Sequence, residues 1–94
     1  MTKSELVAVI CDKRKDLPKK DIELVVNTIF NSMRKALIRD ERIEIRGFGS
    51  FTVKRRDARQ GRNPKTGTPV QIPPKRIPFF TVGKELRERV NNDN

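Results

Sequence analysis

The chain has 94 residues, with 22 lysines and arginines against 12 aspartates and glutamates, for a formal net charge of +10. This length suits one domain, and so large a surplus favours a polyanionic partner over a basic face kept only for solubility. Histidine is absent, and we find no metal-ligand cluster, phosphate-loop pattern or nucleophile beside a base. We therefore expect no enzymatic activity, no metal, no cofactor and no small-molecule substrate.

The sequence also limits where the protein acts. Its single cysteine, Cys11, excludes an internal disulfide, which fits a reducing compartment. The N-terminus does not resemble a secretory leader, and no apolar run is long enough to span a bilayer. We expect a cytoplasmic protein without a membrane partner.

The positive charge is concentrated in one segment. Residues 53–76 hold eight basic side chains and one acidic, whereas residues 1–40 hold nine basic and six acidic. Only three apolar residues lie between Lys54 and Arg76. Such a segment cannot bury itself, and a two-stranded ribbon alone is marginally stable in water. We expect it to be mobile until it meets a ligand.

Two helices are expected in the first 40 residues. Thr2, followed by Glu5, is a possible capping box, and the apolar residues after it recur at helical spacing. This spacing places Cys11 on the inward face, as a buried small hydrophobe rather than a reactive thiol. After Pro18, apolar residues over 22–37 keep the helical repeat for more than four turns.

The second helix carries more apolar surface than one neighbour needs. Phe30 and Ile38 widen its stripe beyond what a short adjacent helix can cover. This excess hints at a second chain.

Strands are predicted from residue 42 onward. Residues 42–46 alternate with period two, and residues 50–53 resume extended structure after a glycine turn. A further strand is expected over about residues 76–81, and residues 84–90 fit a short final helix. The predicted order is two helices, two strands, a basic arm, a strand and a helix.

The arm, residues 54–75, is expected to consist of two strands joined by a turn. Asn63, Pro64 and Gly67 are placed as turn chemistry requires. From Phe51 to Asn63 at the tip, an extended chain of ~3.3 Å per residue would reach roughly 40 Å, which is more than one turn of duplex DNA. The turn alone favours an ordinary turn proline at position 64, but a rigid apolar residue can also wedge between bases.

Arginine suits phosphate tracking because its flat fork donates two hydrogen bonds to one phosphate. The arm residues expected to track phosphates are Arg55, Arg56, Arg59, Lys75 and Arg76.

Three motifs in order resemble the HU and integration host factor family of bacterial DNA-bending proteins. They are residues 47–51 (GFGSF), residues 61–67 (GRNPKTG) and residues 78–86 (PFFTVGKEL). The resemblance covers nearly the whole chain, and residues 44–46 resemble the beta subunit of integration host factor more than HU.

The resemblance implies a single α+β domain over residues 1–94 that forms an intertwined dimer with projecting two-stranded β-arms. The implied parts are a helical dimerisation base (1–40), a three-stranded antiparallel sheet per chain (41–53 and 76–82), the DNA-binding arm (54–75) and a C-terminal helix (83–91). Homodimer and heterodimer with a homologous subunit both stay open.

The family also implies roles for particular residues. By resemblance, Pro64 is the intercalating residue at the tip and Arg46 takes part in reading a preferred site. The implied DNA-binding residues are Lys3, Arg46, Lys54, Arg55, Arg56, Arg59, Arg62, Asn63, Pro64, Lys65, Lys75, Arg76, Lys84 and Arg87. The implied aromatic dimer core is Phe48, Phe51 and Phe80.

The function implied is that of an architectural protein of the nucleoid, which bends double-stranded DNA through the minor groove in nucleoid organisation, recombination, replication or transcription. Two features depart from the family: Phe79 is more apolar than typical, and the prolines at 73 and 74 must interrupt the arm's pairing because proline cannot donate to a ladder. The alternative is a basic RNA-binding or ribosome-associated protein, although the five phenylalanines look like core rather than stacking residues.

Overall fold

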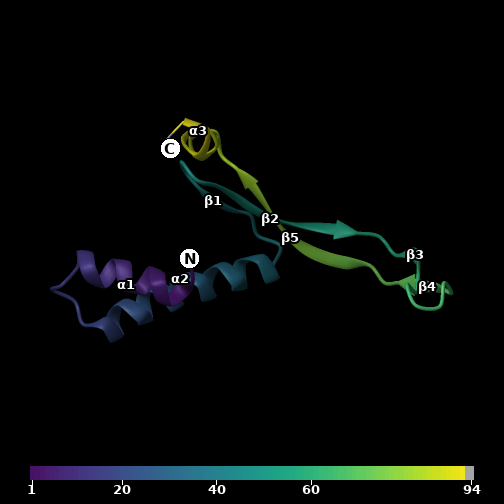
Figure 1. The fold of residues 1–94 in the computed structure, drawn as a ribbon, viewed down its shortest axis with the longest axis horizontal. Helices are drawn as coiled ribbons and strands as arrows, with labels where there is room; N and C mark the ends of the chain where they lie inside the picture. The colour runs from purple at the N-terminus through teal and green to yellow at the C-terminus, as the bar shows by residue number, and fades with distance from the viewer. Residues whose placement is uncertain (93–94) are drawn as a thin grey trace. The chain divides into compact units, whose positions relative to one another are not determined.

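The computed structural model describes residues 1–92, and the chain divides into two compact units, Met1–Lys35 and Ala36–Asn94. Its elements follow the predicted order (Figure 1). They are α1 (Lys3–Lys13), α2 (Lys19–Ile38), β1 (Ile43–Ile45), β2 (Gly49–Arg56), β3 (Arg59–Arg62), β4 (Pro69–Ile72), β5 (Lys75–Val82) and α3 (Lys84–Asn92).

The first unit is a helix pair. Thr2 caps α1, because its side-chain oxygen accepts the backbone N–H of Glu5 at 3.1 Å, as the sequence predicted. Cys11 is half-buried and packs against the small core, so it does lie on the inward side of the helix. The residues of that core are Val7, Ile22 and Val26. None of the helices within residues 1–92 has the length and apolarity needed to cross a membrane.

Much of the apolar stripe of α2 stays in contact with solvent in the single chain. Val25 is 55 % exposed, Ile29 52 % and Ile38 69 %. Contiguous apolar surface of this kind marks an interaction site in a soluble protein. The prediction that one neighbouring helix cannot cover the stripe is therefore confirmed.

In the second unit, β1, β2 and β5 form an antiparallel sheet with β2 at its centre. All eight residues of β2 pair with β5, from Gly49 opposite Val82 to Arg56 opposite Lys75. Since side chains alternate between the two faces of a strand, this register sorts the residues of both strands onto two opposite faces. The sheet thus continues through the first residues of the predicted arm and ends at Arg56 and Lys75.

The turn between β1 and β2 brings three phenylalanine rings together. Gly49 is buried, and a Cβ there would lie 2.5 Å from the Thr81 carbonyl oxygen and 2.6 Å from the Phe80 ring. The missing side chain lets the Phe80 ring pack, tilted, against Phe51 and Phe48, at centroid distances of 4.8 and 5.5 Å. Phe48 and Phe80 are nevertheless 45 % and 38 % exposed.

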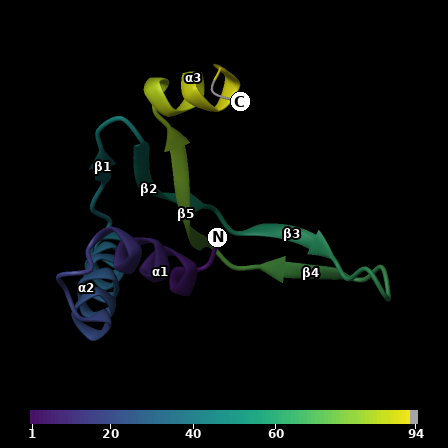
Figure 2. The same ribbon diagram turned by 60° about the vertical axis from the view of Figure 1, so that its left-hand side comes forward.

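The rest of the arm is a separate two-stranded ribbon, β3 paired with β4. It extends beyond the end of the β2–β5 pair that is remote from α3, as both views show (Figures 1 and 2). Pairing stops after Ile72 and resumes at Lys75, so the strand breaks at Pro73 and Pro74. The predicted interruption is confirmed, and its cause is the missing N–H of proline.

We predict that Gly49→Ala loosens the aromatic cluster. The added methyl group has no space against Thr81 and Phe80, so the substitution should cost about 1–3 kcal/mol, which is a drop in Tm of several degrees for a domain of this size. Thermal unfolding followed by circular dichroism measures it. Gly67→Ala measures the opposite case, backbone strain without crowding, because Gly67 has positive φ and a Cβ there would meet nothing within 4 Å. An unchanged Tm for Gly49→Ala would contradict the steric argument.

Candidate nucleic-acid interface

The tip of the arm is an ordered turn organised by Asn63. Its backbone carbonyl accepts the N–H of Gly67 at 2.7 Å, and its side-chain oxygen accepts the N–H of Lys65 at 2.9 Å. Gly67 has φ of 72°, the left-handed conformation expected of a turn glycine. Arg62 donates to the Gly67 carbonyl at 3.2 Å, and Pro64 is exposed in the turn. The turn predicted from the sequence is therefore present, with a rigid apolar residue at its exposed end.

At the root of the arm, the strand register divides the basic residues into two groups. Lys54, Arg56 and Lys75 share one face of the β2–β5 pair, whereas Arg55 and Arg76 share the other. A shallow hollow at the break between sheet and ribbon is lined by Arg56, Arg59 and Lys75, together with the carboxylate of Asp57. The structure thus gathers three cations from three strands, and one acidic residue, around one depression.

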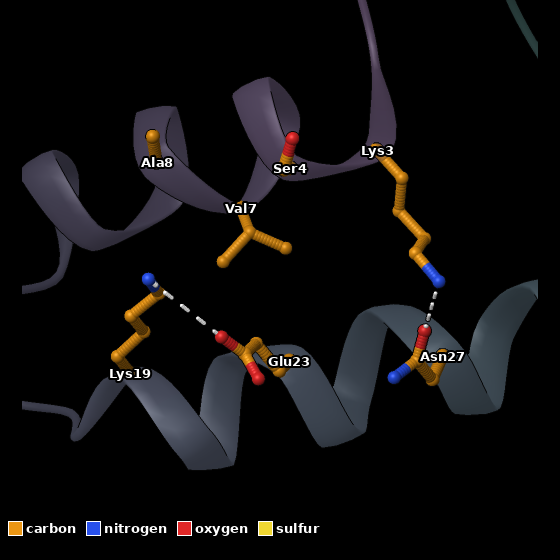
Figure 3. Close-up of a pocket in the computed structure, with 7 residues that line it drawn as sticks. All are labelled: Lys3, Ser4, Val7, Ala8, Lys19, Glu23 and Asn27. Atoms are coloured by element: carbon orange, nitrogen blue, oxygen red, sulfur yellow. Dashed lines mark hydrogen bonds and ion pairs between the residues drawn. The ribbon is translucent and has the colours of Figure 1, made fainter.

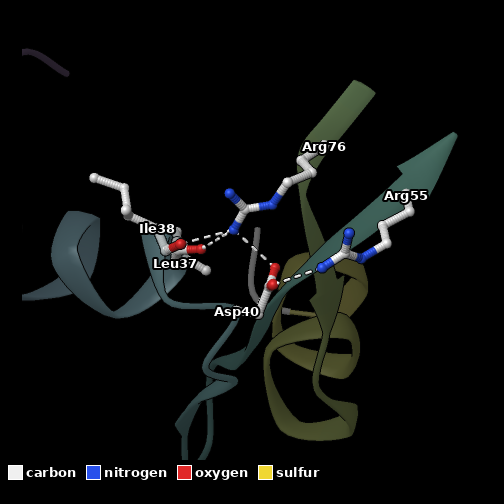
Figure 4. A network of polar contacts seen from close by, with 5 residues as sticks. All are labelled: Leu37, Ile38, Asp40, Arg55 and Arg76. Carbon is white, nitrogen blue, oxygen red and sulfur yellow. Dashed lines mark hydrogen bonds and ion pairs between the residues drawn. The ribbon is translucent and has the colours of Figure 1, made fainter. Parts of the chain in front are cut away.

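Arg55 and Arg76 converge on one carboxylate (Figure 4). Arg76 Nη2 lies 2.8 Å from Asp40 Oδ1, and Arg55 Nη2 lies 2.8 Å from Asp40 Oδ2. Arg76 also donates to the backbone carbonyls of Leu37 and Ile38, at 3.3 and 2.7 Å. The hydrogen bond from Arg76 holds the pKa of the Asp40 carboxyl below its usual value, and the charge of Arg55 acts in the same direction.

Lys54 has an aromatic partner on its own face. Its Nζ lies 3.6 Å from the centroid of the Phe79 ring, the geometry of a cation–π contact. The exposed ring of Phe79 thus gives Lys54 a partner on the same face of the sheet.

Lys3 lies in the other unit, at the mouth of a shallow pocket between α1 and α2 (Figure 3). Its ammonium group donates to the Asn27 side-chain oxygen at 2.8 Å, and Lys19 and Glu23 form an exposed ion pair in the same pocket. One hydrogen bond leaves the other two ammonium N–H groups of Lys3 available as donors.

The remaining predicted residues lie in the sheet unit but outside the arm. Arg46 is exposed in the turn between β1 and β2, where it lines a hollow with Gly83. Lys84 and Arg87 are exposed on α3, with Lys84 in a long contact of 4.0 Å to Glu88. These residues do not form a cluster with the basic residues of the arm.

Asp40 is the residue that sequence reasoning missed. It lies 15 residues from Arg55 and 36 from Arg76 along the chain, so no local motif links them. The one local signal is an aspartate just after a helix end, where a left-handed residue is common and glycine is usual. Within residues 1–92, no group of three or more potential metal ligands is present.

Comparison with known proteins places these features in a family. A sequence profile of the family described as "Bacterial DNA-binding protein" matches residues 1–91. Integration host factor subunit beta of Alkalilimnicola ehrlichii is 57 % identical over 91 residues, covering 97 % of this chain and 91 % of the relative. The same subunit of Marinobacter nauticus is 56 % identical over 92 residues, covering 98 % and 94 %. Among solved structures, an Anabaena HU–DNA cocrystal structure is similar with a TM-score of 0.88 and 37 % identity, covering 98 % of this chain and 99 % of that one.

We predict that Arg76→Gln raises the pKa of Asp40 toward its usual value, and that Arg55→Gln raises it less, because Arg76 supplies the largest effect. The pKa is lower in the folded chain, so the ionised carboxylate stabilises the fold above the unfolded-state pKa, and this contribution is lost as pH falls through the folded-state pKa. A carboxyl-carbon NMR titration of the parent and both variants measures the midpoints. An unchanged midpoint in Arg76→Gln would show that the hydrogen bond is not formed in solution.

Proposed function

Because this chain belongs to the HU and integration host factor family of bacterial DNA-binding proteins, we propose that its β-arm enters the minor groove of duplex DNA and bends the duplex. Family membership makes it an architectural DNA-binding protein rather than an enzyme, and favours DNA over the RNA alternative. The observation that carries the proposal is the exposed, basic ribbon with a proline at its tip.

The tip offers hydrogen-bond donors to its target. The minor groove at A·T pairs presents only acceptors, adenine N3 and thymine O2. The side-chain oxygen of Asn63 is used within the turn, which leaves its amide N–H groups as donors. Arg62 uses part of its guanidinium on Gly67 and has further N–H groups to donate. Both tip residues thus match the groove in chemistry.

Pro64 is proposed as the wedge. Minor-groove architectural proteins, this family among them, insert an apolar residue between base pairs and kink the duplex. Unstacking costs a few kcal/mol per step, which the additional phosphate contacts of the bent duplex offset. Those contacts fall to basic residues of the root, such as Arg56 and Lys75, and to Lys84, Arg87 and Lys3.

The working unit is proposed to be a dimer. The exposed stripe of α2 and the half-exposed phenylalanine cluster are apolar surfaces that a second copy or a homologous subunit would cover. Each chain brings one arm, so two arms would hold the duplex at two positions. The similarity to beta subunits of integration host factor keeps an unlike partner open.

Site preference is proposed to depend on Arg46, which is exposed at the turn between β1 and β2. Deformability of the bent sequence would add to it by indirect readout. The process served is nucleoid organisation or a recombination, replication or transcription event that needs a bent duplex.

We predict that Pro64→Ala reduces bending far more than binding. Loss of the wedge leaves the basic contacts in place, so affinity should fall by no more than roughly tenfold, about 1.4 kcal/mol. End-to-end energy transfer in a doubly labelled duplex reports the bend, and titration of the same duplex reports affinity. Pro69→Ala, on the same ribbon but outside the turn, is the matched control and should bend DNA like the parent. Equal bending by parent and Pro64→Ala would refute the wedge.

We predict that Ile29→Asp dissociates the dimer. A carboxylate buried at an apolar interface costs several kcal/mol, which corresponds to a rise in the dimer dissociation constant of roughly 100-fold or more. Sedimentation equilibrium of the purified chain, alone or with its homologous subunit, measures it. Asn31→Asp adds the same charge on the polar side of the same helix turn and should leave the dimer intact. A parent chain that stays monomeric under both conditions would remove the proposed dimer.

A further inference from the structure

We propose that Asp40 is a positioning residue: it holds Arg55 and Arg76 so that they fix the root of the arm to the end of α2, while the basic residues on the opposite face contact phosphate. The inference rests on the proposed function, because it divides the basic residues of the DNA-binding arm into two classes.

The backbone around Asp40 is built for an exposed residue at a helix end. The N–H of Asp40 donates to the Leu37 carbonyl at 3.1 Å and that of Glu41 to the Ala36 carbonyl at 2.9 Å, the paired bonds of a Schellman motif. Asp40 has φ of 61°, a conformation that favours glycine. Aspartate tolerates it better than most residues, yet glycine would close the helix with less strain. Closure of the helix therefore does not explain why this position carries a carboxylate.

The carboxylate of Asp40 bridges two arginines. Arg55 and Arg76 are directly opposite each other in the β2–β5 register, where like charges repel. One carboxylate oxygen of Asp40 takes each guanidinium at 2.8 Å, which converts a repulsive pair into a bridged one. Arg76 also satisfies the carbonyls of Leu37 and Ile38 at the negative end of the helix dipole.

Isolated exposed ion pairs contribute little to the stability of a protein. This network differs because one shared carboxylate joins two strands and a helix end (Figure 4). Rotation of the root away from the end of α2 would break all of these contacts together. The network therefore restrains the end of the β2–β5 sheet relative to the end of α2.

The next cross-strand pair is different. Arg56 and Lys75 are also opposite each other, but they lie on the other face, and within residues 1–92 neither side chain makes a hydrogen bond or an ion pair. Arg56 and Lys75 can therefore contact phosphate without breaking an existing contact. Arg55 and Arg76 already direct one Nη2 group each at Asp40, whose carboxylate offsets part of their positive charge. The two pairs are equal in charge and adjacent in register, so they form a matched comparison.

The experiment compares the salt dependence of duplex binding for two double variants, Arg56→Gln with Lys75→Gln and Arg55→Gln with Arg76→Gln. Each lost phosphate contact lowers the log–log salt slope by about one. We expect the first variant to lower the slope. The second should leave the slope unchanged, weaken binding at every salt concentration and reduce the hydrogen-exchange protection of β2 and β5 at the root.

Asp40→Gly and Asp40→Asn test the carboxylate itself. Glycine suits the backbone conformation, so Asp40→Gly keeps the helix end while it frees both arginines. We expect both variants to reproduce the weaker binding and lower protection without a change of slope. The loss of affinity caused by Asp40→Gly or Asp40→Asn should vanish when Arg55 and Arg76 are already glutamine. It should add to the loss caused by Arg56→Gln. The reason is that, in a double-mutant cycle, only interacting residues depart from additivity.

Two results would overturn the positioning role. One is an equal loss of slope in both double variants, which would make Arg55 and Arg76 phosphate contacts. The other is tighter binding by Asp40→Gly with protection unchanged, which would make Asp40 merely a competitor of DNA. Failure of the proposed function gives a different result, a parent protein whose duplex binding hardly changes with salt.

Discussion

The pairing of β2 with β5 is the constraint from which the interface follows. Eight residues of each strand are held in one antiparallel register, and this register fixes which side chains share a face. One face carries the tilted rings of Phe51 and Phe80 and, further along, Arg55 and Arg76; the other carries Phe79, Lys54, Arg56 and Lys75. A shift of one residue in a strand would move its side chains to the opposite face and would take an arginine away from Asp40.

The composition of the arm does not allow it to form a core of its own. It has too few apolar side chains to form a core, so its order comes from cross-strand pairing and from the turn at Asn63. The break at Pro73 and Pro74 separates this ribbon from the sheet. The Asp40 network and the hollow that Arg56, Asp57, Arg59 and Lys75 line both lie at the root, where the sheet ends. In the proposed function, the charge that meets DNA and the contacts that hold the root come from neighbouring residue pairs.

A single chain leaves a large part of its apolar surface uncovered. Within residues 1–92, the buried apolar residues are Val7, Ile22 and Val26, and both the stripe of α2 and the phenylalanine cluster remain in contact with solvent. Small domains bury a limited fraction of their surface on folding, so covering these apolar surfaces would add to the stability of the chain. In the proposed dimer, the association that covers them would also provide the second arm.

The sequence alone determined the helices, the turn and the concentration of charge, because each depends on residues that are close together along the chain. The repeat over 22–37, the turn residues at 63–67 and the surplus over 53–76 are each properties of contiguous residues, and each is present in the structure. The sequence also located the break in the arm, since proline lacks an N–H wherever it occurs. It did not separate Arg55 from Arg56, which are neighbours of the same chemistry. Only the tertiary structure did so, because strand register sends adjacent side chains to opposite faces and brings Asp40, distant along the chain, to one of them.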